Sequence, residues 1–130
     1  MPPDSNEVKR WVEKADHDRI AAADALTHTP PITDVAAFHC QQAVEKLLKA
    51  FLVHQREPFE RIHDLVELLA TCTRCDPAFE ALRSCVEPLT PYAVRFRYPG
   101  PADPSVEQAT AALEAVHVVW QFVLDRLPKE

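Results

Sequence analysis

Glycine is almost absent from this sequence: Gly100 is the one glycine among 130 residues. All-β folds place glycine in tight hairpin turns, and nucleotide-binding loops need it where the backbone approaches a phosphate. Neither the GxGxxG pattern nor a Walker-type GxxxxGK pattern occurs. The sequence therefore excludes Rossmann-type and Walker-type nucleotide binding, and it argues against a fold built on a sheet.

Long apolar runs and an excess of basic residues are also missing. No run approaches the roughly 20 apolar residues that span a membrane, and the first ten residues lack the apolar stretch of a signal peptide. We therefore expect no membrane association and a cytoplasmic location. Twenty acidic against 14 basic residues give a net charge of −6, which argues against a general nucleic-acid coat. The length and the 47% hydrophobic content predict a single domain over residues 1–130.

Twelve prolines separate long proline-free intervals. Proline is excluded from helix interiors but tolerated in the first turn, and apolar residues recur at helical spacing within these intervals. Helices are predicted over about 5–26, 34–53, a short segment from about 63, 76–86 and 103–127. We therefore predict an all-α fold, an antiparallel up-and-down bundle of four to five helices.

The residues before these helices predict how each one begins. Asp4 has capping-box spacing to the acidic residue three positions later, and Thr33 precedes the second helix as its N-cap. His63 is interpreted as the cap of the third helix. Asp76 and Asp103 each precede a proline, which is the usual arrangement of a cap and a first helical position.

Polar side chains recur along the second predicted helix. His39, Gln42, Lys46 and Lys49 follow spacings of three, four and three, so they form one stripe, and Glu45 is placed to pair with Lys49. One interpretation is a solvated helix face with pairs inside the helix. The other is a stripe that faces a cleft or a second subunit and binds a nucleotide or RNA through Gln42, Lys46 and Lys49.

A second candidate site lies in residues 88–102, which contain no acidic residue. Arg95 and Arg97 alternate with a phenylalanine and lie between Tyr92 and Tyr98. Arginine offers a rigid fork of donors to a phosphate, and aromatic rings offer a surface on which a base can stack. The alternative is that the aromatic rings pack a connection, predicted over 90–102, against the bundle while the arginines pair with acidic residues at the surface.

Metal-binding patterns are incomplete. Cys72 and Cys75 form one CxxC, but a zinc site needs two further ligands and no second CxxC, CxxH or HExxH occurs. Cys40 and Cys85 lie at apolar positions and are interpreted as core residues. We therefore expect neither a metal nor a cofactor.

Four segments together resemble the HEPN domain (the nucleotide-binding domain of higher eukaryotes and prokaryotes). The second helix carries FHCQQAVEKLLKA at 38–50, and the opening helix has its W…KA…D…A…L pattern at 11–26. HDLVELL at 63–69 and YAVRFRYP at 92–99 are similar to the third helix and to the Y…RYP segment of the family. These matches occur in the family's order and span nearly the whole chain.

The resemblance implies a helical bundle that dimerises, with a cleft lined by polar residues of the second helix and by the arginine segment. It also implies a minimal nucleotidyltransferase as partner, in some cases within a toxin–antitoxin pair. A subset of the superfamily are metal-independent ribonucleases, in which an arginine is followed after four to six residues by a histidine. Here the histidine after Arg97 is His117, far beyond that spacing.

Three functions follow as hypotheses. The first is a homodimeric module that binds nucleotide or RNA and works with a nucleotidyltransferase. The second is a ribonuclease toxin, with Arg97 steadying the phosphate and His63 as the base. In that case Tyr98 would be a target for modification by the partner. The third is a structural adaptor whose function is its dimer surface, and whether the protein is an enzyme stays open.

Overall fold

The structure, a computed structural model, describes residues 5–62, 64–93 and 102–128, and these contain helices and no strand. The predicted all-α fold is confirmed. The elements in chain order are α1 Ser5–Thr27, α2 Thr33–His54, α3 Leu65–Cys75, η1 Pro77–Leu82, α4 Arg83–Val86, η2 Glu87–Ala93 and α5 Val106–Leu124, where η marks a 3-10 helix.

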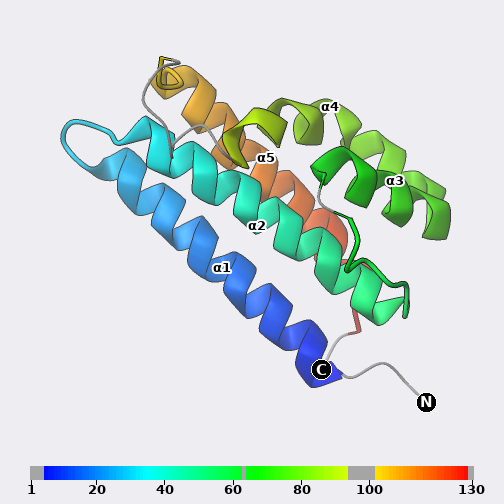
Figure 1. Cartoon of the computed structure of the whole chain (residues 1–130). Helices are drawn as coiled ribbons and strands as arrows, with labels where there is room; N and C mark the ends of the chain where they lie inside the picture. Colours follow the sequence, from blue (N-terminus) through cyan, green and yellow to red (C-terminus); the bar gives the residue numbers. More distant parts are fainter. Residues whose placement is uncertain (1–4, 63, 94–101, 129–130) are drawn as a thin grey trace.

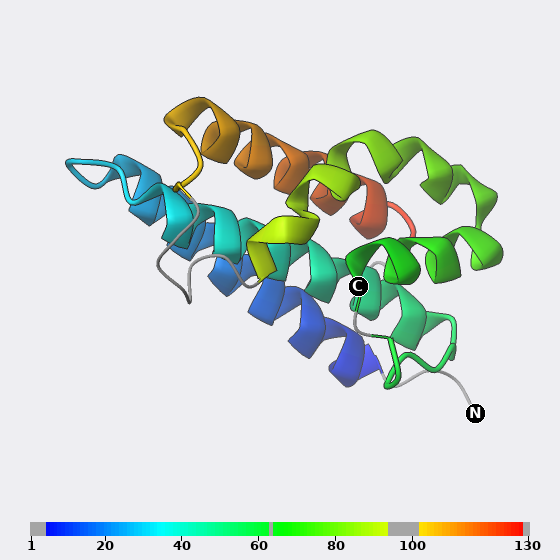
Figure 2. The same cartoon turned by 45° about the horizontal axis from the view of Figure 1, so that its top comes forward.

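Helix α2 lies at the centre of the bundle. It runs antiparallel to α1, and α5 lies along it in the same direction as α2 (Figure 1). The chain from α3 to η2 packs on the side of α2 opposite α1, so that the third leg of the bundle consists of four short pieces (Figure 2). Consequently no residue of α2 is fully exposed, and even its polar stripe is half-buried.

The core joins all of these elements. Aromatic rings connect three of them: Phe79 of η1 lies 4.4 Å from Phe51 of α2 and 4.9 Å from Phe122 of α5, between ring centroids. Such tilted and edge-to-face contacts add to the stabilisation that comes from burial alone. The described helices include none that is long and apolar enough to cross a membrane.

Two of the predicted helix caps are wrong and a third is confirmed. Thr33 is already helical, and the position before it, Ile32, makes no side-chain capping bond. The last helix begins later than Asp103 predicts: Ser105 is its N-cap. Asp76 caps η1 as predicted and accepts a hydrogen bond from the backbone N–H of Ala78 at 3.0 Å.

At the third helix the observed cap is Asp64, which accepts a hydrogen bond from the N–H of Val66 at 2.8 Å. His63 and Asp4, the other residues predicted to take part in capping, lie outside the described residues. A short carboxylate side chain is a preferred N-cap, and its charge also complements the positive end of the helix dipole. Asp64 therefore caps α3 and also places a negative charge at the positive end of its dipole.

The chain after α3 is more helical than predicted. The expected single helix over 76–86 is split into η1 and α4, and the predicted connection from Thr90 is still part of η2, which ends at Ala93. Buried Leu89 holds η2 against the core. Because η2 contacts α2, this segment brings Tyr92 back to the central helix.

Candidate polar site between helices one and two

A buried carboxylate organises the polar stripe of α2. Asp18 of α1 is 9% exposed and lies between two residues of that stripe. Its Oδ1 atom is 2.8 Å from Nδ1 of His39, and its Oδ2 atom accepts a hydrogen bond from Nζ of Lys46 at 2.6 Å. A carboxylate removed from water is costly unless charged donors satisfy it. Asp18, His39 and Lys46, hereafter the Asp18 cluster, satisfy this requirement across the α1–α2 interface.

The pairing determines the tautomer of His39. An ionised carboxylate only accepts hydrogen bonds, so Nδ1 of His39 carries a hydrogen and donates a hydrogen bond to Asp18. Nε2 then remains the acceptor of the neutral ring. The imidazole side chain is 29% exposed, so the ring is half-buried and still accessible to solvent. An imidazole oriented by a carboxylate in this way is suited to accept a proton from a ligand.

The network continues along α2 beyond the Asp18 cluster. Nζ of Lys46 is 3.5 Å from Oε1 of Gln42, whose amide nitrogen donates to Oε1 of Gln41 at 2.6 Å. Gln41 donates in turn to Oε1 of Glu45 at 3.4 Å, and Lys49 pairs with Oε2 of Glu45 at 2.9 Å. The predicted site residues Gln42, Lys46 and Lys49 therefore belong to one continuous set of hydrogen bonds.

Lys49 has a further set of contacts. Its ammonium group lies 5.6 Å from the ring centroid of Trp11 and 5.6 Å from that of Phe59. The two rings are themselves in edge-to-face contact, with centroids 5.8 Å apart. Cation–π contacts and the ion pair with Glu45 both fix this lysine against the bundle.

Both lysines of the stripe are thus compensated by carboxylates. A pair inside the helix is present between Glu45 and Lys49, but both side chains are half-buried and Lys46 pairs with a residue of α1. Such a stripe offers little uncompensated positive charge to a phosphate.

Three other residues predicted to bind a nucleotide or RNA lie outside the described residues: Arg95, Arg97 and Tyr98. His63, the candidate base, lies outside them as well.

Tyr92 is the remaining predicted residue, and it lies apart from the stripe. It is half-buried on η2, packs against the core and lines a pocket between η2 and α5. The described part of the predicted site is therefore divided between two places. One is the α1–α2 interface, with Gln42, Lys46 and Lys49, and the other is the pocket that contains Tyr92.

Comparisons with known proteins agree with these observations. The family model of the HEPN domain matches residues 8–127. This chain belongs to the HEPN domain family. The crystal structure of TT1696 from Thermus thermophilus is similar over 94% of this chain and 99% of that one, with 27% sequence identity and a TM-score of 0.81. No curated protein matches the chain.

The cysteines of this HEPN domain are held inside the bundle or at its rim. Burial, together with the nearby charge of Asp18, raises the pKa of the Cys40 thiol to about 12. Cys72 is buried and donates from Sγ to the carbonyl oxygen of Leu48 at 3.7 Å, and burial raises the pKa of this thiol as well. Cys75 is exposed at the end of α3. Within residues 5–62, 64–93 and 102–128 no three metal-ligating side chains come together.

Sequence reasoning missed Asp18, and it left His39 out of the binding residues. A signal for Asp18 was present, because it continues the helical spacing of the buried positions Ala15, Ala22 and Ala25 on α1. A carboxylate in the register of an apolar face must find a donor on a neighbouring helix. The sequence does not say which helix that is, and in this HEPN domain it is α2.

Proposed function

We propose that this HEPN domain is a nucleotide- or RNA-binding and interaction module. It acts as a homodimer in the cytoplasm with a minimal nucleotidyltransferase, as one half of a toxin–antitoxin-type pair. The observation that carries this proposal is the family match over residues 8–127, which includes both the α2 signature and the arginine segment. The coarser assignment, a HEPN domain with a nucleotide-related role, is what the family membership supports directly.

Charge compensation on α2 supports different roles for the lysines and the arginines. Lys46 and Lys49 are each paired with a carboxylate and serve mainly to hold the helices in place. The cations that contact the phosphate are then Arg95 and Arg97, which have no acidic residue near them in the sequence. The chain from Tyr92 to Arg95 spans at most about 10 Å even when extended. This closeness in the sequence supports one site shared by Tyr92 and the arginines.

The proposal is tested by replacing one arginine. Arg97→Ala should weaken the affinity for ATP, measured by isothermal titration calorimetry, by about tenfold or more, because a charge-assisted hydrogen bond contributes roughly 1.5–3 kcal/mol. The helical circular dichroism should stay unchanged. Arg83→Ala is the matched control, since Arg83 pairs with Glu80 on the surface of the short helices. An unchanged affinity would remove Arg97 from the site, and no heat with any nucleotide or RNA would favour the structural adaptor.

The metal-independent ribonuclease is the second candidate function, and one observation favours it. Asp18 orients the half-buried ring of His39 through Nδ1, so that Nε2 is free to act as the general base that the arginine segment lacks. In this reaction Nε2 takes the proton of a ribose 2′-hydroxyl, the oxygen attacks the adjacent phosphorus, and the bond to the 5′-oxygen breaks. The departing oxygen takes up a proton from water.

A gel assay with single-stranded RNA and a chelator decides between the two functions. The ribonuclease cleaves without metal, loses cleavage in His39→Ala and in Arg97→Ala, and keeps it in the control His117→Ala, a change at an exposed position on α5. Loss of cleavage in His63→Ala instead would assign the base to that residue. Intact RNA with the wild-type protein would leave the binding module as the function.

A further inference from the structure

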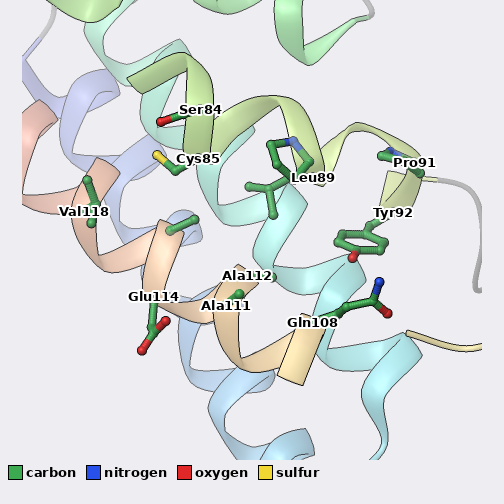
Figure 3. Close-up of a pocket in the computed structure, with 12 residues that line it drawn as sticks. Ser84, Cys85, Leu89, Pro91, Tyr92, Gln108, Ala111, Ala112, Glu114 and Val118 are labelled. Carbon is green, nitrogen blue, oxygen red and sulfur yellow. The ribbon is translucent and has the colours of Figure 1, made fainter. Parts of the chain in front are cut away.

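A pocket of about 580 Å³ lies between η2 and α5 (Figure 3). One wall comes from η2, with Pro88, Leu89 and Pro91, and the other comes from α5, with Ala111 and Ala112. Alanine methyl groups fill little of the space between the two elements, and prolines contribute to the opposite wall. The volume is within the range of small-molecule sites, roughly 300–1,000 Å³. We call this pocket the slot.

Hydrogen-bonding groups gather at one end of this slot. Gln108 lies beside Tyr92 there, with its amide nitrogen directed toward the tyrosine ring (Figure 3). The orientation of this amide is fixed, because its Oε1 atom accepts a hydrogen bond from the N–H of Ser105 at 2.8 Å as part of the α5 capping box. Among the described residues, neither Nε2 of Gln108 nor the hydroxyl of Tyr92 has a hydrogen-bond partner. Within the part of the chain that the structure describes, two donors without a partner thus lie at one end of the slot.

The charge of the slot disfavours the phosphate end of a nucleotide and permits the base. Glu114 lies on the rim, and it is the one charged side chain among the described residues that line the slot. A carboxylate repels a phosphate, so the phosphate end of a nucleotide is disfavoured inside. An uncharged heterocyclic ring is compatible with the proline and alanine walls, and its edge can accept hydrogen bonds from Gln108 and Tyr92.

We propose that this slot binds the nucleobase of the ligand. The inference rests on the proposed function and adds to it the part of the ligand that is recognised and the residues that recognise it. The base lies between the proline face of η2 and the alanine face of α5. Tyr92 and Gln108 contact its edge, and the ribose and phosphate remain outside. The base can belong to a free mononucleotide or to single-stranded RNA, and the chemistry of recognition is the same.

The proposal is tested by filling the slot with a larger side chain. Ala111 is exposed and lines the slot, so Ala111→Phe occupies the space of the base without entering the core. Thr110→Phe is the matched control, because Thr110 is an exposed residue next to it that does not line the slot. Tyr92→Leu provides a second variant if Ala111→Phe does not fold. Circular dichroism checks folding, and saturation-transfer NMR and calorimetry measure binding of adenosine, inorganic triphosphate, ATP and oligoadenylate.

We expect adenosine to bind the wild-type protein and Thr110→Phe, and to lose at least about tenfold in affinity in Ala111→Phe. Inorganic triphosphate should bind all three alike. A slot that serves RNA loses affinity for oligoadenylate in Ala111→Phe and keeps its affinity for ATP, whereas a slot that serves mononucleotides loses affinity for ATP.

Three results would overturn the proposals, and they differ. ATP and adenosine that bind Ala111→Phe as they bind the wild type would refute the slot and leave nucleotide binding in place. Wild-type protein that binds none of the phosphate-containing ligands would refute the proposed function itself. A dimer that dissociates in Ala111→Phe while adenosine binding is unchanged would assign the slot, with the exposed Val118 at its edge, to a contact between two copies.

Discussion

Asp18 illustrates how a single side chain can set the register of two helices. It is nearly buried, yet each of its oxygens has its own donor on α2. Those donors are seven positions apart, on the same face two turns from each other. A shift of α1 along α2 by one turn would break at least one of these bonds and leave a buried charge unpaired. The Asp18 cluster therefore specifies the alignment of α1 with α2 as well as stabilising it.

Replacing this carboxylate should lower stability markedly. Asp18→Asn keeps the shape of the side chain but removes its negative charge, so the half-buried Lys46 loses its counter-charge. We expect the free energy of unfolding to fall by about 2 kcal/mol, because charge-assisted hydrogen bonds contribute roughly 1.5–3 kcal/mol. Urea denaturation followed by circular dichroism measures this difference.

Two further variants test the cause of that loss. Asp16→Asn removes another aspartate of α1, one that pairs with Arg19 at the surface, and it should cost less than about 1 kcal/mol. Adding Lys46→Met to Asp18→Asn should recover part of the stability, because the unpaired ammonium group is removed. The loss of stability in the double variant is compared with the sum of the losses in Asp18→Asn and in Lys46→Met alone. If the two are equal, the two side chains are not coupled.

At the scale of elements, the sequence predicted the long helices well. The expected ranges 5–26 and 34–53 agree with α1 and α2 within a residue at each end. Proline-free intervals and apolar periodicity are sufficient here, because both are local properties of a helix. The segment from Asp76 to Ala93 was predicted less well. It contains prolines at 77, 88 and 91, and these divide it into short helical pieces whose ends depend on packing against α2.

The beginning of α5 shows how two valid local signals can compete. Asp103 before Pro104 has the pattern of a cap, but Ser105 is followed three positions later by Gln108 and forms a complete capping box. The reciprocal pair satisfies two backbone N–H groups where a single cap satisfies one. Counting the bonds that each candidate can make would have selected Ser105 from the sequence.

The candidate site was predicted only in part, for a different reason. Helical spacing places His39, Gln42 and Lys46 on one face of α2, where Nζ of Lys46 lies 3.5 Å from Oε1 of Gln42. The contact with Asp18 depends on which helix packs against that face, and no local pattern carries this information. Phosphate binding by Arg95 and Arg97 stays a prediction, since both lie outside the described residues.

At the scale of the whole molecule, one ion pair joins parts of the chain that are distant in sequence. Asp76, between α3 and η1, accepts a hydrogen bond at 2.8 Å from Nε of Arg126, 50 residues away and just beyond α5. The guanidinium group of Arg126 also lies 3.6 Å from the ring centroid of Phe122. These contacts join the segment from α3 to η2 to the end of α5 that lies opposite the slot.

This ion pair should make part of the stability depend on pH. The hydrogen bonds from Arg126 and from the N–H of Ala78 lower the pKa of Asp76 below its ordinary value. The unfolded chain therefore binds a proton at higher pH than the folded protein does. The stabilisation is complete above the ordinary aspartate pKa of about 3.9, and it is lost as the pH falls through the lower pKa of the folded state.

Asp76→Asn isolates this effect, because an asparagine can still accept the hydrogen bond from Ala78 and cap η1. We expect the variant to be less stable than the wild type by about 0.5–1 kcal/mol near pH 7, since the pair is partly exposed. The difference should shrink toward zero as the pH falls below the ordinary aspartate pKa and Asp76 of the wild type becomes protonated too. Urea midpoints at a series of pH values measure it. A difference that is the same at every pH would mean that the substitution acts through packing, and that the charge of Asp76 contributes nothing to holding α5 against the short helices.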